Sequence, residues 1–250
     1  MHLIFISIPI FDVIAGILVV LFAFFVRATI GFGSGLISVS FLTILLPIRI
    51  TVPAVFILDF IGSIILGAYD LKEVKWNDLS YLLPSTVLGL LLGAYVFKYA
   101  DPQKLTIFLG IFIIMYIIYA LKVKQDKLPY VKNAVGAPLG FLGGFIGSLY
   151  GGGGPPIVAY LQMKHHDKRT FRATFQIVAI TDSIVRAAIY LSFGLITLKV
   201  LKFSGLLMPS LLIGLFFGNK MHFKINQKTF YYSVLIILSL AAIGLIIHSM

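Results

Sequence analysis

The chain has 250 residues, of which 60% are hydrophobic and 12% are charged, and its mean hydropathy is +1.04. A soluble domain of this length does not need so much apolar surface, so the composition excludes that class and predicts an all-α polytopic membrane protein. The absence of cysteine excludes disulfides, thiolate metal sites and cysteine nucleophiles. We interpret the net charge of +11 as basic cytoplasmic loops that face anionic lipid, and we expect no nucleic-acid partner.

Ten apolar segments lie between the charged breaks of the chain. They cover residues 10–29, 34–46, 52–69, 80–98, 105–121, 134–149, 155–163, 172–193, 204–219 and 230–248. The first lacks the basic start and small-residue cleavage site of a signal peptide, so we expect it to be a retained helix. Most segments approach the ~20 residues needed to span a bilayer, but 34–46 and 155–163 are too short for that.

Both short segments follow a cluster of glycines. The first cluster reads GFGSG, from Gly31 to Gly35, and the second reads GGGGPP, from Gly151 to Pro156. In lipid, irregular chain is tolerated only inside protein or beside a watery cavity. Each cluster is therefore either a surface loop or a helix that is deliberately broken at a site.

The two halves of the chain resemble each other. PSTVLGLLLG (residues 84–93) recurs as PSLLIGLFFG (residues 209–218), and a Gln-Lys pair follows each copy. This predicts an internal duplication, with a first transmembrane repeat at 1–121, a basic cytoplasmic linker at 122–133 and a second repeat at 134–250. Each repeat contains about five helical segments, one of them a short helix that a glycine break precedes.

Positive charge predicts the orientation of the repeats. If the short segments cross the membrane, the two repeats are inverted and both termini lie outside. The cytoplasmic side then holds Lys72, Lys75, Lys122, Lys124, Lys127, Lys132, Lys164, Lys168, Arg169, Arg172, Lys220, Lys224 and Lys228, and the other side holds Arg49, Lys98, Lys104, Lys199 and Lys202. If the short segments are re-entrant instead, the positive charges divide almost evenly, so the positive-inside rule favours inverted repeats.

Inverted repeats with one broken helix each are typical of secondary transporters, in which the substrate lies near the midplane at the breaks. Backbone N–H groups at such breaks bind anions. Pro155 and Pro156 suit the first turn of a helix, where their missing N–H groups are not needed. The alternative is that the glycines only allow close helix packing, which is our interpretation of Gly89, Gly93, Gly214 and Gly218.

Few polar residues lie inside the apolar segments, and each is a candidate for function. Arg27 precedes GFGSG, and it is either a site residue or a residue that snorkels to the interface. Asp59 has no charged neighbour in sequence, which makes it a proton-carrier candidate. Asp182 and Arg186 lie one helical turn apart, as a site or as a structural pair. The candidate substrate-binding residues are Arg27, Gly31, Gly33, Ser34, Gly35, Gly151, Gly152, Gly153, Gly154, Pro155, Gln176, Asp182 and Arg186.

Enzyme and pump chemistry are not indicated. Ser34 has no histidine base nearby, because the histidines lie in predicted loops or at the termini, and we interpret His165 and His166 as part of a solvated basic loop. No nucleotide-binding G-x-x-x-x-G-K-[ST] loop occurs. We therefore expect no cofactor and no bound metal.

The motif from Gly143 to Pro156, G-G-x-x-G-x-x-x-G-G-G-G-P-P, resembles the sulfite exporter TauE/SafE family of membrane permeases. The Asp182–Arg186 helix and the P-x4-G-x3-G element of each half resemble it too. The resemblance implies transport of small sulfur-containing anions, such as sulfite, sulfonates, sulfoacetate or thiosulfate, across the plasma membrane of bacteria and archaea. Asparagine is commoner in that family at the position of Asp182, and the extra carboxylate is positioned to neutralise Arg186.

The sequence thus predicts a secondary transporter of small anions that is coupled to protons. The alternatives are a passive anion channel, or a permease for a small carboxylate or another inorganic anion. The expected partners are the anionic substrate, the lipid bilayer and further copies of the chain.

Overall fold

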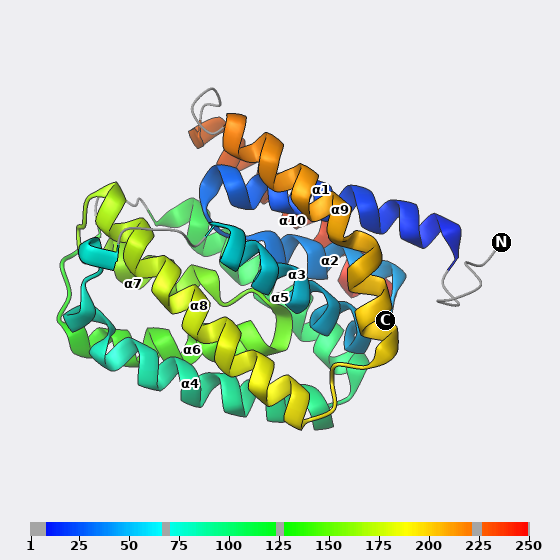
Figure 1. Ribbon diagram of the computed structural model, residues 1–250, viewed down its shortest axis with the longest axis horizontal. Helices are drawn as coiled ribbons and strands as arrows, with labels where there is room; N and C mark the ends of the chain where they lie inside the picture. Colours follow the sequence, from blue (N-terminus) through cyan, green and yellow to red (C-terminus); the bar gives the residue numbers. More distant parts are fainter. Residues whose placement is uncertain (1–8, 67–70, 124–127, 222–226, 250) are drawn as a thin grey trace. The chain divides into compact units, whose positions relative to one another are not determined.

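The computed structural model describes residues 9–66, 71–123, 128–221 and 227–249, which form helices joined by short turns (Figure 1). The α-helices are α1 (Ile10–Ile30), α2 (Ser34–Leu45), α3 (Ile48–Leu66), α4 (Trp76–Tyr99), α5 (Pro102–Lys122), α6 (Gly136–Tyr150), α7 (Gly154–Gln162), α8 (Lys168–Ser192), α9 (Leu198–Met221) and α10 (Gln227–Ser249). Single 3-10 turns, η1 (Leu71–Glu73) and η3 (Asn133–Val135), precede α4 and α6. No β-strand occurs within these ranges.

The ten predicted apolar segments correspond to these ten helices, which confirms an all-α polytopic membrane protein. Within the described residues, six helices are long and apolar enough to cross a bilayer, namely α1, α3, α4, α5, α8 and α9. By contrast, α2 has 12 residues and α7 has 9. At about 1.5 Å per residue these short helices are roughly 18 and 14 Å long, well below the ~30 Å of a hydrocarbon core.

The chain divides into two compact units that do not follow the sequence halves. Unit 1 contains Met1–Gly62, Asp101–Ile117 and Gly194–Met250, and unit 2 contains Ser63–Ala100 and Ile118–Phe193. Each unit therefore combines helices from both predicted repeats. The repeat boundaries and their inverted relation stay predictions, and Lys124, Lys127 and Lys224 of the predicted cytoplasmic set lie outside the described residues.

In unit 1, α1 and α9 run in parallel with their backbones in contact. A Cβ atom added at Gly214 of α9 would lie 2.5 Å from the carbonyl oxygen of Leu21, and one at Gly218 would lie 2.5 Å from that of Phe25. Both positions therefore require glycine for close packing, which confirms that interpretation. On α1, Gly16 faces Leu42, so α2 folds back along α1.

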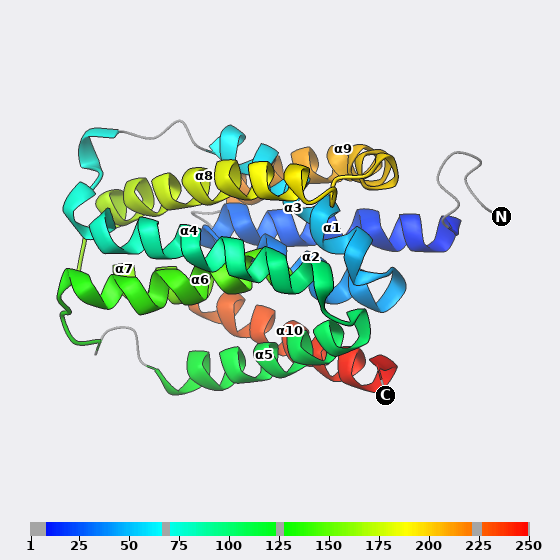
Figure 2. The ribbon, with the colours of Figure 1, turned by 90° about the horizontal axis from the view of Figure 1, so that it is seen from below.

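In unit 2, α4, α6 and α8 run in the same direction (Figure 2). Between α4 and α6, a Cβ atom added at Gly89 would lie 2.1 Å from the carbonyl oxygen of Phe141, and one at Gly93 would lie 2.4 Å from that of Phe145. Here too the glycines allow backbone contact. Between α4 and α8, the hydroxyl of Thr174 accepts a hydrogen bond from the Lys75 N–H at the start of α4. At the far end of the two helices, the rings of Phe97 and Tyr190 stack.

The short helix α7 runs back along the whole of α6. A Cβ atom at Gly147, near the end of α6, would meet Gly153 at 3.7 Å, whereas one at Gly136, where α6 begins, would meet Tyr160 at 3.0 Å. Because α6 and α8 are parallel, the chain must run back between them. The glycine break and α7 together make this return path alongside α6. Whether the short segments cross the membrane or re-enter on the same side stays a prediction.

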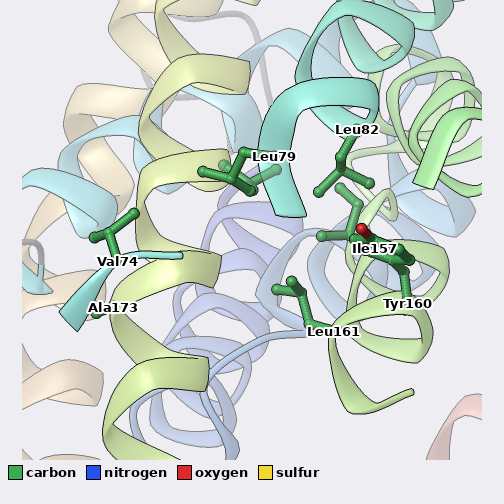
Figure 3. Close-up of a cluster of buried hydrophobic side chains, with 8 residues drawn as sticks. Val74, Leu79, Leu82, Ile157, Tyr160, Leu161 and Ala173 are labelled. Carbon is green, nitrogen blue, oxygen red and sulfur yellow. The ribbon is translucent and has the colours of Figure 1, made fainter. Parts of the chain in front are cut away.

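The far end of α7 is held in an apolar core where α4, α7 and α8 meet. Ile157, Tyr160 and Leu161 of α7 lie against Leu79 and Leu82 of α4 (Figure 3). The hydroxyl of Tyr160 also donates a hydrogen bond of 2.9 Å to the carbonyl oxygen of Asp78. The short helix is therefore fixed at its C-terminal end, while its N-terminal end lies at the glycine break.

Candidate functional site

The first break, between α1 and α2, is built on two glycines in the left-handed region. Gly31 has φ 104° and Gly33 has φ 99°, a conformation that residues with a Cβ rarely adopt. The N–H of Gly31 donates to the carbonyl oxygen of Arg27 at 2.7 Å and ends α1. Ser34 and Gly35 then begin α2 and are buried. The GFGSG cluster is therefore a broken helix, as predicted.

The second break, between α6 and α7, uses one left-handed glycine and one tightly packed glycine. Gly151 has φ 66°, and its N–H donates to the carbonyl oxygen of Gly147 at 2.9 Å. A Cβ atom at Gly153 would lie only 2.2 Å from the carbonyl oxygen of Gly143. Gly154 begins α7, with Pro155 and Pro156 in its first turn, as predicted. Gly152 and Gly153 are buried, so this cluster is not a surface loop.

Beside the first break, Arg27 of α1 forms a buried ion pair with Asp59 of α3. The Nη1 atom of Arg27 donates to the Asp59 carboxylate at 2.9 Å and to the Asp59 carbonyl oxygen at 3.1 Å. The hydroxyl of Ser34 donates to the same carboxylate at 2.5 Å. The view of Asp59 as a lone carboxylate was wrong, because its partner lies 32 residues away in sequence. Arg27 is only 7% exposed and points to Asp59, so the snorkelling alternative was also wrong.

A buried hydroxyl one turn further along α2 has no hydrogen-bond partner. Ser38 is fully buried, and its Oγ atom is one of the few unpartnered buried polar side-chain atoms among the described residues. Ser38 lies four residues after Ser34 and therefore on the same face of the helix. An unsatisfied buried hydroxyl costs about 1–3 kcal/mol, so Ser38 is available to a bound molecule.

Beside the second break, Arg186 and Asp182 form a buried ion pair on one face of α8, as their spacing predicted. The Nη2 atom of Arg186 donates to the Asp182 carboxylate, and Nη1 donates to the carbonyl oxygen of Gly147 at 2.9 Å. The next turn of α8 carries Tyr190, whose hydroxyl donates to the carbonyl oxygen of Ser148 at 2.6 Å. These contacts attach α8 to the last turn of α6, directly before the break.

The predicted site residue Gln176 has a different partner. It is buried on α8, and its side-chain amide donates to the carbonyl oxygen of Ser63 at 2.8 Å. Among the residues that the structure describes, no hydrogen bond joins Gln176 to Asp182 or Arg186. Its role in substrate binding stays a prediction, as do the roles of the break glycines.

Both ion pairs hold their charges away from water. Burying a guanidinium is costly unless a carboxylate and further hydrogen bonds satisfy it, and both arginines receive such partners. The planar guanidinium matches the oxygens of a carboxylate, and it would equally match those of a sulfite or sulfonate. An incoming anion would therefore compete with Asp59 or Asp182 for the same donors.

A third charged cluster, in unit 2, was missed by the sequence analysis. Lys164 is 4% exposed, and its Nζ lies 3.2 Å from the carboxylate of Asp78 and 3.0 Å from the carbonyl oxygen of Val131. The Nε2 atom of His166 lies 2.6 Å from the same carboxylate. The interpretation of His165 and His166 as part of a solvated loop agrees with the exposed His165, but it was wrong for His166, which is partly buried and contacts Asp78. A signal in the sequence was Asp167, which caps the start of α8 and leaves only a short turn between α7 and α8.

No three His, Asp or Glu side chains in the described part of the chain lie close enough together to hold a metal ion. The two guanidinium groups offer hydrogen bonding and charge pairing.

Comparison with protein families matches residues 16–245 to the family described as Sulfite exporter TauE/SafE. One curated relative is the "Probable inner membrane transporter protein TsaS" of Comamonas testosteroni, which is 24% identical over 143 residues. The alignment covers 56% of this chain and 59% of that relative, so it spans less than two thirds of the relative's length. No solved structure matches the chain.

Proposed function

Because the chain belongs to the sulfite exporter TauE/SafE family, we propose that it is a secondary transporter of small sulfur-containing anions, such as sulfite, thiosulfate or sulfonates of the sulfoacetate type. The family and the name of the relative support a membrane transporter, and six apolar helices support a multi-pass membrane protein. We place it in the plasma membrane of a bacterium or archaeon, and we propose no enzymatic activity.

The observation that carries this proposal is a buried arginine beside each helix break. Arg27 and Arg186 are 7% and 6% exposed, and each lies next to a glycine-ended helix. A guanidinium in such surroundings binds an anion through two parallel N–H donors, and this is stronger in a water-poor site than at a surface.

Proton coupling follows from the carboxylates that occupy these arginines in the empty protein. An anion that replaces Asp59 at Arg27 leaves a buried carboxylate without its cation, which is costly. Such a carboxylate takes up a proton, because burial disfavours its charged form. The anion and a proton then bind together, and the proton cancels one of the anion's negative charges.

The main alternative is a passive anion channel, and a permease for a small carboxylate or another inorganic anion is the second. A channel needs no titrating partner for its arginines, so it would tolerate neutral amides at positions 59 and 182. The ion pairs favour the coupled transporter, because in each pair a carboxylate already binds the guanidinium that an anion would use.

The test is uptake into proteoliposomes from a panel of sulfite, thiosulfate, sulfoacetate and acetate, with and without a pH gradient. We expect at least one sulfur-containing anion to accumulate when the outside is acidic, because protons then drive its entry. Asp59→Asn should lose the acceleration by the pH gradient and retain counterflow exchange, since the amide keeps the shape but carries no proton.

Uptake that never exceeds equilibrium and ignores the pH gradient would favour the channel. Transport of acetate in preference to all sulfur-containing anions would favour the carboxylate permease. If neither class of anion is transported, the proposed function is wrong.

A further inference from the structure

We propose that each compact unit carries its own anion site, so that one chain binds two anions at once. This inference rests on the proposed function, and it replaces a single shared binding site with two. It follows from a correspondence between the two guanidinium–carboxylate pairs that the sequence alone does not reveal.

The two pairs occupy the same place relative to their breaks. In unit 1 the carbonyl oxygen of Arg27 accepts the N–H of the left-handed Gly31, and in unit 2 the carbonyl oxygen of Gly147 accepts the N–H of the left-handed Gly151. Arg27 and Gly147 are therefore equivalent positions in the last turn before a break. In unit 1 the residue at this position is the arginine itself. In unit 2 the guanidinium of Arg186 donates a hydrogen bond to the carbonyl oxygen of the residue at this position, Gly147.

The arginine comes from opposite helices in the two units. Unit 1 places it on α1, the helix before the break, and unit 2 places it on α8, the helix after the short one. In both units the carboxylate comes from the later helix, as Asp59 of α3 or Asp182 of α8. Each break therefore has a guanidinium beside it, although the arginine is on the helix before the break in unit 1 and on the helix after the short one in unit 2.

A glycine faces each pair from the helix that lacks the arginine. In unit 1 a Cβ atom at Gly62 of α3 would lie 2.9 Å from the ring of Phe24 and 3.4 Å from Nη1 of Arg27. In unit 2 a Cβ atom at Gly147 of α6 would lie 3.4 Å from the carboxylate of Asp182. The absence of a side chain at each glycine therefore lets the ion pair pack closely against the neighbouring helix.

Each set of groups is complete within one unit. Unit 1 contains Arg27, Asp59, Ser34 and the unpartnered hydroxyl of Ser38, and unit 2 contains Arg186, Asp182 and Gly147. Each arginine has one carboxylate to exchange, so two anions are bound when both sites fill.

The test is equilibrium dialysis of radiolabelled thiosulfate, and separately of sulfite, against the purified full-length protein in nanodiscs. We expect two anions per chain. The paired neutral variants Arg27→Gln with Asp59→Asn, and Arg186→Gln with Asp182→Asn, should each reduce the stoichiometry to one. The combination of all four changes should abolish binding. Each paired variant keeps polar side chains and leaves no unpaired charge, and thermal unfolding verifies that it is folded.

A matched control is available at an exposed pair outside both breaks. Arg169 and Glu73 lie 3.7 Å apart, with side chains 67% and 35% exposed, and Arg169→Gln with Glu73→Gln should leave two anions bound. If the wild-type chain transports but binds only one anion, and either paired variant loses that anion, the two-site inference is wrong. The proposed function would then still stand. Absence of both binding and transport for both anions would overturn the inference and the proposed function together.

Discussion

Arg186 donates a hydrogen bond of 2.9 Å to the carbonyl oxygen of Gly147, the same oxygen that accepts the N–H of Gly151 at the end of α6. The arginine of α8 is thereby tied to the helix before the break. Because Gly147 has no side chain, the ion pair approaches α6 closely, with the Asp182 carboxylate 3.4 Å from where a Cβ atom at position 147 would lie.

Moving the arginine from α8 to α6 should therefore preserve the site. Arg186→Ser alone leaves Asp182 buried without a cation, which costs about 3–5 kcal/mol of folding stability and abolishes anion binding. Adding Gly147→Arg should restore both, since a Cβ atom there makes only ordinary contacts and the arrangement copies that of Arg27. Thermal unfolding and thiosulfate binding measure the two effects. If the double variant is no more stable than Arg186→Ser, the two breaks are not equivalent.

Two glycines of α9 provide a matched test of helix contact. Gly214→Ala places a Cβ atom 2.5 Å from the carbonyl oxygen of Leu21, so α1 and α9 must separate, at a cost of about 1–3 kcal/mol. Gly205→Ala meets nothing within 4 Å and should stabilise the helix by about 0.5–1 kcal/mol. Thermal unfolding of the purified variants should therefore shift in opposite directions. Equal shifts would contradict the backbone contact.

Substitution of Gly153 should disrupt the second break. In Gly153→Ala the Cβ atom would lie 2.2 Å from the carbonyl oxygen of Gly143, which forces α7 away from α6. We expect loss of transport with the protein still inserted in the membrane, as judged by proteoliposome uptake and membrane fractionation. Pro156→Ala, in the first turn of α7, is the control and should retain transport, because an alanine fits that turn without a clash. Normal transport by Gly153→Ala would show that the position of α7 is not critical.

The ends of α8 test the predicted orientation. The chain has no cysteine, so Arg169→Cys at the start of α8 and Lys199→Cys beyond its end are single labelling sites. Both residues are exposed. Because basic residues collect on the cytoplasmic side, an impermeant maleimide should label position 199 in intact cells and position 169 only after permeabilisation. The reverse pattern would invert the topology.

The carboxylate of Asp78 should stabilise unit 2 strongly. Asp78→Asn leaves the buried Lys164 without its counter-ion and should cost about 3–5 kcal/mol of unfolding free energy. Glu73→Gln removes the exposed partner of Arg169 and should cost about 0–1 kcal/mol. Denaturant unfolding of the two variants, each compared with the parent chain, gives the contrast. Similar losses would mean that Lys164 does not depend on Asp78.

The sequence predicted what depends on neighbours along the chain. Hydropathy located all ten helices, glycine clusters located both breaks, and the spacing of Asp182 and Arg186 fixed their pairing on one helix. The pairing of Arg27 with Asp59 was out of reach, because 32 residues separate them and only the packing of α3 against α1 unites them. For the same reason, the pairing of Lys164 with Asp78 could not be predicted from the sequence. Nor could the exchange of helices between the two sequence halves, which depends on glycine contacts between α4 and α6 and between α1 and α9.

That exchange imposes an order on biosynthesis. All of unit 2 precedes Gly194 in the chain, whereas α1 needs α9, which begins at Leu198. From the end of α1 at residue 30 to the start of α9 at residue 198 the ribosome adds 168 residues, which takes about ten to thirty seconds at roughly 5–20 residues per second. Unit 2 can close as soon as α8 is inserted. During the same interval the glycine-contacting face of α1 has no partner, so a nascent chain stalled before residue 198 would hold a finished unit 2 and an α1 exposed to lipid or to the insertion machinery.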